Sequence, residues 1–510
     1  MIWDNLKSSL LADLAQRIDA RADELDRPSL HKLAAAFYDR FPAEDMRERS
    51  VENIYGCTYG LLRFIRQWPE NEPAVRIFNP EIQSHGWENK HTVLVILCRG
   101  IPFVTASVRG ELNRRNMLIH TIASCNLSVR RDADGRLLEV LDEQDDDYSS
   151  GPGEALLYFE IGRHSKPETL NDLRATLADI IREAEVVVDD FHPMCERMAA
   201  VAEEIMASKC VALPLREEAA EFLRWVLDKH MTLLGYEYIE VQRNGSDPHL
   251  RVVDDASLGL LRNRQTRGVE DLRADLERMT REELHRRQLS FSKSRQRSRV
   301  HRLTYPDYVE SRVFDDEGEL VGQHRFIGLY TSSVYTMNPN LIPILRKKVQ
   351  RVLELSNLNW AEHTSRELVR VLELFPRDEL FQSSIRQLAD TVNAVNRIQE
   401  RRQTRLFIRE DVHRKFVNCM VYIPRDRYTT EQREKIETIL CNSFKAEECE
   451  FTTHFSESIL VRCHFVLRVN PAVPLQYDTA ELEDQIVQAT LAWSDRLRNR
   501  LIEEFGEEQG

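Results

Sequence analysis

The spacing of apolar positions in the first seventy-five residues is typical of amphipathic helices. One stripe contains Trp3, Leu6, Leu10 and Leu14, and a second contains Leu30, Leu33, Phe37 and Phe41. Between residues 77 and 89 the helical period ends in a segment rich in turn residues, which includes Asn79-Pro80 and Ser84-His85-Gly86. The pattern therefore predicts an N-terminal helical segment, with a new domain beginning near residue 76.

The next hundred residues alternate between strand and helix patterns. Residues 93–97 form a continuous apolar run that suits a strand buried on both faces, and Gly100 and Pro102 end it. Apolar residues at helical spacing follow up to Leu112. Residues 119–129 then alternate between apolar and polar side chains, as a half-buried strand requires. With residues 137–141, residues 156–161 and a helix after Pro167, the order is strand, helix, strand, strand, helix.

Similar hairpin-then-helix units recur along the chain. Strands are predicted at 308–314 and 320–330 before a helix at 341–355, and at 417–423 before a helix whose start carries a capping box, Thr429 with Gln432. Residues 459–469 alternate as a further strand, and an apolar stripe from Leu482 onward predicts a closing helix. These units, separated by helical connectors, predict an α+β fold.

Composition narrows the class of protein. A chain of 510 residues with 42% hydrophobic and 30% charged residues is expected to fold into several domains. The net charge of −14 argues against nonspecific nucleic-acid binding, and no apolar run is long enough for a membrane span or a signal peptide. Nine cysteines without a C-x-x-C pair indicate a cytoplasmic protein with reduced thiols and no bound metal.

Catalytic and nucleotide-binding signatures are missing from the sequence. Gly151-Pro152-Gly153 follows an acidic loop and lacks the third glycine of a dinucleotide fingerprint, so we interpret it as a loop. The run 142–147 reads as a cation site or as a solvated hairpin tip. The basic segment 281–302 has two interpretations. It is a binding site for RNA or an acidic effector, or it is a charged exposed strand or linker. We therefore predict no catalytic residue in this chain.

The most informative local feature is the turn between the buried strand and the helix that opens near Pro102. Free N–H groups at a helix N-terminus attract a carboxylate, so the turn could bind a small amino acid. The alternative is a structural turn that needs Gly100 only for its backbone angles. Arg99 would neutralise a second carboxylate, and nearby hydroxyl groups would add hydrogen bonds. The candidate effector-binding residues are Arg99, Gly100, Ile101, Pro102, Thr105, Ser107 and His120.

Several strings read together resemble the N-terminal region of the large multidomain bacterial NAD-dependent glutamate dehydrogenases. They are spread from about residue 30 to the C-terminus in the family order: Arg76-Ile77-Phe78-Asn79-Pro80, His85-Gly86-Trp87, Ile101-Pro102-Phe103-Val104, Leu112-Asn113-Arg114, Arg131-Asp132-Ala133-Asp134-Gly135, Phe326-Ile327-Gly328-Leu329-Tyr330 and Pro376-Arg377-Asp378-Glu379-Leu380-Phe381-Gln382. The resemblance implies three ACT-like, ferredoxin-like βαββαβ modules interleaved with helical segments. It also implies that the NAD site and the glutamate site lie in a catalytic region C-terminal to this segment.

The resemblance implies a domain order that agrees with the patterns above. We expect an N-terminal helical segment (1–75), ACT-like domain 1 (76–190), a helical connector (191–235), ACT-like domain 2 (236–350), a second helical connector (351–402), ACT-like domain 3 (403–475) and a C-terminal helix (476–510) leading to the catalytic region. Since ACT domains bind amino acids where a strand–helix turn meets another module, residues 100–107 acquire a candidate role.

The leading hypothesis is an amino-acid-sensing regulatory and oligomerisation region of a glutamate dehydrogenase. The complete enzyme would convert L-glutamate, NAD and water into 2-oxoglutarate, ammonia and NADH. The expected partners are other copies of the chain, the catalytic region of the same polypeptide and a small amino-acid or carboxylate effector. The alternatives are a scaffold that binds no ligand and an independent enzyme of another type. Arg99, Gly100 and Thr105 depart from the acidic residues expected around this turn, so the sequence leaves the effector unidentified.

Overall fold

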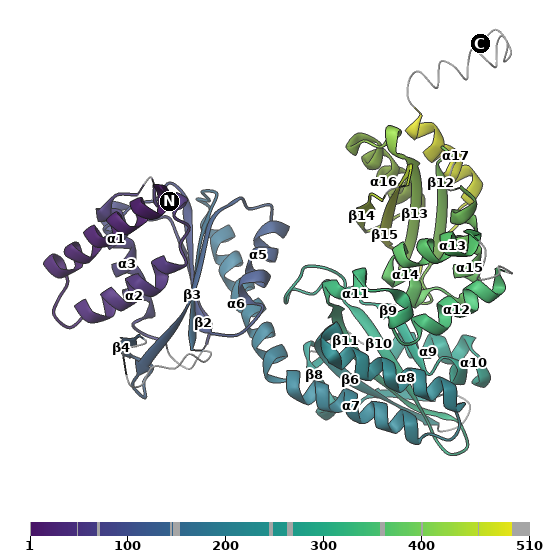
Figure 1. The fold of residues 1–510 in the computed structure, drawn as a ribbon. Helices are drawn as coiled ribbons and strands as arrows, with labels where there is room; N and C mark the ends of the chain where they lie inside the picture. Colours follow the sequence, from purple (N-terminus) through teal and green to yellow (C-terminus); the bar gives the residue numbers. More distant parts are fainter. Residues whose placement is uncertain are drawn as a thin grey trace, which may run out of the picture. The chain divides into compact units, whose positions relative to one another are not determined.

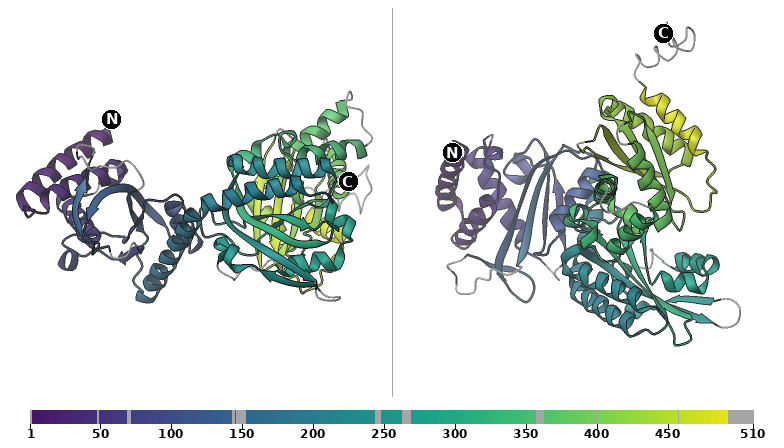
Figure 2. Two further views of the ribbon diagram at one scale, coloured as in Figure 1. Left: turned by 90° about the horizontal axis from the view of Figure 1, so that it is seen from below. Right: turned by 45° about the vertical axis from the view of Figure 1, so that its right-hand side comes forward.

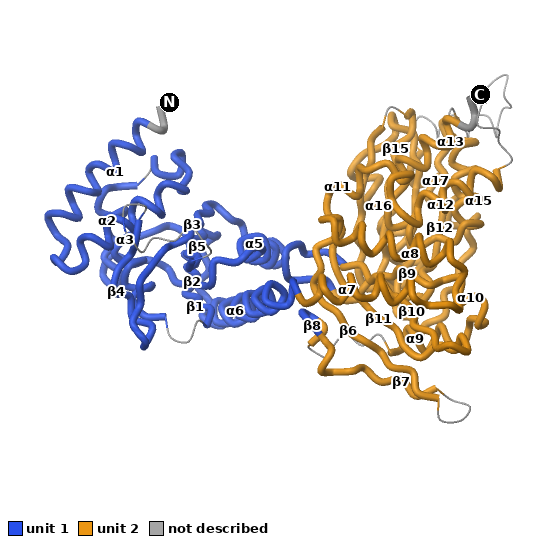
Figure 3. The backbone as a smooth tube through the Cα atoms, turned by 60° about the horizontal axis from the view of Figure 1, so that its bottom comes forward, with its two compact units in different colours: residues 1–192, 258–260, 297–305 blue, residues 193–257, 261–296, 306–510 orange. Residues whose placement is uncertain are grey.

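The computed structural model describes residues 2–47, 49–68, 72–142, 145, 153–243, 248–262, 269–356, 363–398, 401–456 and 458–491. The chain forms two compact units (Figure 3). Unit 1 comprises residues 1–192, 258–260 and 297–305, and unit 2 comprises residues 193–257, 261–296 and 306–510. The predicted C-terminal helix beyond residue 491 and most of the acidic run 142–147 lie outside the described residues.

Unit 1 begins with helices that pack on one face of a sheet. They are α1 (Ile2–Arg21), α2 (Arg27–Asp39) and α3 (Val51–Ile65). The predicted stripe of Leu30, Leu33, Phe37 and Phe41 is buried in one core with Tyr158 of the sheet. Of the earlier stripe, Leu14 is buried in this core. The helical segment therefore completes the hydrophobic core of the first sheet.

The first sheet has the strand order β1-β2-β5-β3-β4, and all its pairs are antiparallel. Its elements are β1 (Ala74–Phe78), α4 (Ile82–His85), β2 (Thr92–Arg99), α5 (Val104–Arg114), β3 (Ile119–Arg131), β4 (Leu137–Leu141), β5 (Glu154–Ile161) and α6 (Pro167–Asp189). Helices α5 and α6 cover the face opposite α1, α2 and α3 (Figure 1, Figure 2). The alternation predicted for β3 is confirmed, with His120 exposed and Thr121 buried.

The strand order corrects the expected βαββαβ arrangement in one respect. Strands β2 and β3 are connected through α5 and flank β5, as the first three strands of that arrangement do. The position of the fourth strand, beside β2, is taken by β1, which precedes β2 in the chain. Leaving aside the one-turn helix α4, the module therefore has the order ββαβββα, in which β4 is an additional edge strand that pairs with β3. The hydrophobic pattern did not reveal this order because it identifies strands without identifying their neighbours.

Unit 2 opens with α7 (Phe191–Ala207) and α8 (Leu213–Trp225), which precede an antiparallel sheet in the order β7-β6-β11-β10-β9. Its elements include β6 (Met231–Arg243), β7 (Pro248–Val252), α9 (Val269–Arg278), α10 (Arg281–Arg286), β9 (Leu289–Lys293), β10 (Asp307–Phe314) and β11 (Leu320–Tyr330). Short strand β8 (Leu258–Gly259) belongs to unit 1. The hairpin predicted at 308–330 is confirmed. Among the described strands of this sheet, no two that are connected through a helix flank a third strand, so the expected βαββαβ order is not found in them.

The helices after this sheet lead to the last sheet. They are α11 (Ser332–Thr336), α12 (Leu345–Leu355), α13 (His363–Leu374), α14 (Arg377–Gln382) and α15 (Ile385–Ile398). The last sheet has the order β12-β13-β15-β14, from β12 (Arg405–Glu410), β13 (Phe416–Pro424), β14 (Glu448–His454) and β15 (Leu460–Arg468), with α16 (Thr430–Phe444) and α17 (Thr479–Thr490). The capping box at Thr429 and Gln432 is confirmed. This module has the order ββαββα, which matches the first module without its additional strand β4, with β12 in the place of β1.

Candidate functional site

The turn after β2 is shaped by a close backbone contact. The Gly100 N–H donates to the Gly153 carbonyl at 2.8 Å, and a Cβ atom on Gly100 would lie 2.8 Å from that oxygen. The backbone of Gly100 is not left-handed; the positive φ of this segment, 77°, belongs to Phe103. The expectation that Gly100 supplies special backbone angles is therefore wrong, and close approach is the reason that a glycine stands there.

The hydroxyl group of Ser107 is already engaged by the fold of unit 1. Ser107 is buried; its Oγ donates to the Phe103 carbonyl at 2.8 Å and accepts from the His301 N–H at 2.9 Å. Helix α5 begins at Val104, two residues after the predicted start at Pro102. Ile101 and Thr105 are half-buried there, and Pro102 is exposed. The hydroxyl that the sequence offered to an effector instead ties α5 to a segment far along the chain.

Arg99 also has a partner. Its Nη1 and Nη2 donate to the two carboxylate oxygens of Asp189 at 2.9 and 2.8 Å. The hydrogen bond with Asp189 raises the pKa of Arg99. A second carboxylate brought by a ligand would have to compete with Asp189 for this guanidinium.

His120 lies at the opposite end of the sheet from this turn. In the strand register Thr92 and Ile119 both pair with Ile161, whereas Arg99 pairs with Glu154. The length of β2 therefore separates the two places, and at about 3.3 Å per residue this is roughly 20–25 Å. The structure keeps positions 99–107 together in one turn, and it does not bring His120 to them.

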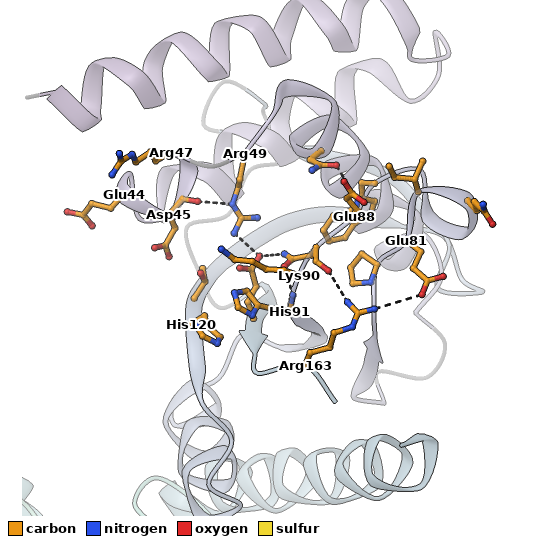
Figure 4. Close-up of a pocket in the computed structure, with 18 residues that line it drawn as sticks. Glu44, Asp45, Arg47, Arg49, Glu81, Glu88, Lys90, His91, His120 and Arg163 are labelled. Atoms are coloured by element: carbon orange, nitrogen blue, oxygen red, sulfur yellow. Dashed lines mark hydrogen bonds and ion pairs between the residues drawn. The ribbon is translucent and has the colours of Figure 1, made fainter. Parts of the chain in front are cut away.

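His120 instead lines a polar cleft of about 1000 Å³ in unit 1 (Figure 4). The rings of His91 and His120 stack in it, with centroids 3.8 Å apart and planes at 20°. Burial and the neighbouring His120 both lower the pKa of His91. The labelled side chains around this stack are Glu44, Asp45, Arg47, Arg49, Glu81, Glu88, Lys90 and Arg163.

One wall of the cleft is a fixed hydrogen-bond network around Glu160. The carboxylate accepts from Arg49 Nη2 at 2.7 Å, from Asn89 Nδ2 at 2.7 Å and from the Tyr158 hydroxyl at 2.6 Å. Burial opposes ionisation of Glu160, but Arg49 and the hydrogen bonds outweigh burial and lower its pKa. Arg163 crosses the cleft wall and donates to the Asn89 carbonyl at 3.1 Å. A rigid wall with charges of both signs suits a small zwitterionic or polar ligand.

Unit 2 contains a buried ion cluster that the sequence analysis missed. Arg325 donates to Glu310 and Glu237, both at 3.0 Å, and to Asp271 at 3.2 Å. Lys415, from the hairpin that joins β12 and β13, also binds Asp271. Charged residues inside otherwise apolar strands were the signal in the sequence, but a single strand pattern does not reveal which charges face each other.

The basic segment 281–302 contributes ion pairs in the structure. Lys293 in β9 binds Asp307 at 2.8 Å and Asp378 at 3.1 Å, and Arg299 binds Glu183 within unit 1. Among the described residues, no three His, Cys, Asp or Glu side chains are grouped so as to hold a metal ion. No helix in the described ranges has both the length and the apolar character needed to cross a membrane.

Comparisons with known proteins identify the domains. Three family models match: the glutamate dehydrogenase ACT1 domain over residues 33–177, helical motif 1 over 342–401 and the ACT2 domain over 405–494. The ACT1 match falls on the first sheet and its helices, and the ACT2 match falls on the last sheet and its helices. The chain is therefore a multidomain region in which ACT domains are combined with a helical motif.

Nearly the whole chain is similar in sequence to the N-terminal region of NAD-specific glutamate dehydrogenases. The chain is 38% identical to the NAD-specific glutamate dehydrogenase of Halomonas elongata over 508 residues and 36% identical to that of Pseudomonas aeruginosa over 521, in each case over 99% of this chain. The enzyme of Mycobacterium tuberculosis is 28% identical over 77% of it. The chain belongs to the NAD-specific glutamate dehydrogenase family and corresponds to its N-terminal region. It spans 31% of the length of the first two relatives.

Proposed function

We propose that this chain is the regulatory and assembly region of an NAD-dependent glutamate dehydrogenase. The complete polypeptide would oxidise L-glutamate with NAD⁺ and water to 2-oxoglutarate, ammonium and NADH. The NAD site and the glutamate site would lie in the catalytic region that follows in the relatives, and this segment would contribute effector binding and contacts between subunits. The observation that carries the proposal is the pair of ACT modules whose sheets share the arrangement β1-β2-β5-β3 and β12-β13-β15-β14, one before and one after the helical motif in the sequence.

The cleft of the first ACT module is the best supported effector site in unit 1. It combines ample volume with the His91–His120 stack and with cationic and anionic side chains that would bind the carboxylate and the ammonium of an amino acid. The turn at Arg99 is less suitable, because Asp189 already binds Arg99 and the Ser107 hydroxyl is already bonded. We therefore assign the effector to the cleft.

Titration calorimetry on the 510-residue chain tests effector binding directly. L-amino acids and succinate are titrated into the wild-type chain, into His120→Ala and into Ser124→Ala, an exposed position on the same strand. We expect binding of at least one ligand that His120→Ala weakens tenfold or more and Ser124→Ala leaves unchanged. Binding that His120→Ala does not change would place the effector elsewhere, and no binding of any ligand would contradict the regulatory half of the proposal.

An assembly scaffold that binds no ligand is the second candidate, and the sheet edges favour it. Among the described strands, β14 pairs only with β15, and Phe451 on β14 is exposed. An unpaired edge carrying an apolar side chain is a template for pairing with a second copy of the chain. Sedimentation of the wild-type chain and of Phe451→Lys checks this: we expect an oligomer that the variant weakens, and a wild-type monomer at all concentrations would refute it.

A further inference from the structure

A small cavity in unit 2 lies on the face of the ACT2 sheet opposite α16 and α17. It has a volume of about 170 Å³ and combines residues of β12 and β13 with residues of the helical motif. At ~30 Å³ per water molecule, this volume corresponds to about six waters, or to an organic ion of similar size. Its lining is Phe375, Glu379, Ser383, Gln387, Leu388, Asp390, Thr391, Phe407, Ile408, Arg409, Asn418 and Met420.

Asn418 is the unusual member of this lining. Its neighbours Val417 and Cys419 point into the core beneath α16 and α17, so Asn418 belongs to the opposite face of β13. It is only 4% exposed, and its side-chain amide makes no hydrogen bond to any other described residue. Because buried amides nearly always have a hydrogen-bond partner, an amide that has none in the protein and lines a cavity is available to a polar molecule in that cavity.

Arg409 pairs directly with Asn418 across β12 and β13. Its Nε and Nη2 donate to the carboxylate of Glu379 at 2.7 and 2.6 Å, and Nη2 also donates to Gln382 at 3.0 Å. Glu379 thus fixes the guanidinium and balances its charge. Nη1 makes no hydrogen bond to another residue of the described chain, so a rigid donor beside the Asn418 amide remains for a ligand carboxylate.

The rest of the lining defines the other end of the ligand. Asp390 is exposed, lines the cavity and forms no ion pair within the described ranges, so it supplies an acceptor for an ammonium group. Since Arg409 and Glu379 balance each other, the charge left on the lining is that of Asp390. Phe407, Leu388 and Met420 provide an apolar wall. A second carboxylate on the ligand would meet Asp390 and Glu379 and would be repelled.

From these features we infer that the cavity binds a small neutral L-α-amino acid. Its carboxylate would accept from the Asn418 amide and Arg409 Nη1, its ammonium would bind Asp390, and its short side chain would contact the apolar wall. The inference rests on the proposed effector-binding function, adds a second site in another domain and selects neutral over acidic amino acids. The sequence analysis predicted an effector site at a strand–helix turn. This cavity instead lies between the face of a sheet and the helical motif.

Calorimetry with L-alanine and L-valine tests the site on the 510-residue chain. The test variant is Asn418→Leu, which keeps the size of the side chain and removes the amide, and the control is Asn442→Leu at an exposed position of the same domain. We expect Asn418→Leu to weaken binding at least tenfold and Asn442→Leu to leave it unchanged. Propionate, which lacks the ammonium, and L-glutamate should bind at least tenfold more weakly than L-alanine.

Thermal unfolding of the ligand-free variants separates binding from stability. Because the Asn418 amide has no bond to lose, Asn418→Leu should unfold at the wild-type temperature or above it; a lower temperature would show a structural role and overturn the inference. Undiminished L-alanine binding by Asn418→Leu would also overturn it. If His120→Ala abolishes that binding instead, the proposed function stands at the cleft alone, whereas a wild-type chain that binds no amino acid refutes both.

Discussion

Replacing Arg325 with Met tests the buried ion cluster that connects α9 with the first sheet of unit 2, β7-β6-β11-β10-β9. Arg325 is 2% exposed, its guanidinium stacks 3.5 Å from the Tyr308 ring centroid, and its three carboxylate partners are all buried. Methionine preserves much of the side-chain volume and removes the charge. The variant therefore leaves buried carboxylates without their cation.

The structure sets the size of the expected effect. Asp271 keeps Lys415 as a partner, whereas Glu237 and Glu310 lose the guanidinium. A hydrogen bond to a charged group contributes about 1.5–3 kcal/mol, so two such losses amount to about 3–6 kcal/mol. Removing one partner of a buried ion pair typically costs about 3–5 kcal/mol, which agrees with this sum. Arg325→Lys should recover only part of the loss, because one ammonium cannot reproduce three directed contacts.

Urea unfolding followed by circular dichroism measures the effect, with the exposed Arg414→Met as the matched control. We expect the transition of unit 2 to lose about 3–5 kcal/mol in Arg325→Met and less than about 0.5 kcal/mol in Arg414→Met. Burial raises the pKa of Asp271, but His413, Lys415 and Arg325 outweigh burial and lower it, so this stabilisation is lost as the pH falls. The gap between Arg325→Met and wild type should therefore narrow at acidic pH. A loss below about 1 kcal/mol at neutral pH would refute the reasoning.

Three further predictions concern the turn, the helical motif and a buried histidine. Gly100→Ala should lower stability by about 1–3 kcal/mol in thermal unfolding, because its Cβ would collide with the Gly153 carbonyl, whereas Gly110→Ala, whose Cβ would meet Leu303 at 3.7 Å, should be neutral or stabilising. Lys348→Met should cost about 2–4 kcal/mol of unfolding free energy, because the side-chain nitrogen donates to the carbonyls of Leu380, Phe381 and Ser383 at 2.7–2.9 Å; an unchanged urea midpoint would contradict this role. Burial opposes protonation of His413, but Asp275 and the charges of Asp271 and Glu310 raise its pKa, so wild-type stability should fall as the pH rises through that pKa. His413→Asn should lack this decline in urea titrations at pH 6 to 9, and an identical pH profile in both proteins would refute the prediction.

The strands of the ACT modules could be predicted from the sequence because burial imposes a simple periodicity on them. The continuous run of β2 and the alternation of β3 each reflect which faces are covered, and both agree with the structure. The place of β1 beside β2 was not predictable, since strand order depends on contacts between segments that the local pattern does not record. The strand order of the sheet β7-β6-β11-β10-β9 was not predictable for the same reason, because it also depends on contacts between distant segments.

The candidate site was harder to predict than the fold. Arg99 and Ser107 looked available to a ligand, but Asp189 and His301, their partners in the structure, are 90 and 194 positions away in the chain. His120 was correctly placed on the solvent side of its strand, yet its neighbour in the cleft, His91, precedes a different strand. Asn418 lies in a strand that the sequence analysis identified from its apolar residues alone. That its amide lacks a hydrogen-bond partner in the protein can be recognised only when both faces of the sheet are known.

Production of NADH from glutamate and NAD is the most direct test of the central claim, that this chain regulates a catalytic region and does not itself react. The purified 510-residue chain is compared with the complete polypeptide, with and without added amino acids. We expect no turnover from the 510-residue chain, and turnover from the complete polypeptide whose rate changes when an amino acid is added. Turnover that scales with the concentration of the 510-residue chain, or a complete polypeptide indifferent to every amino acid tested, would contradict the account.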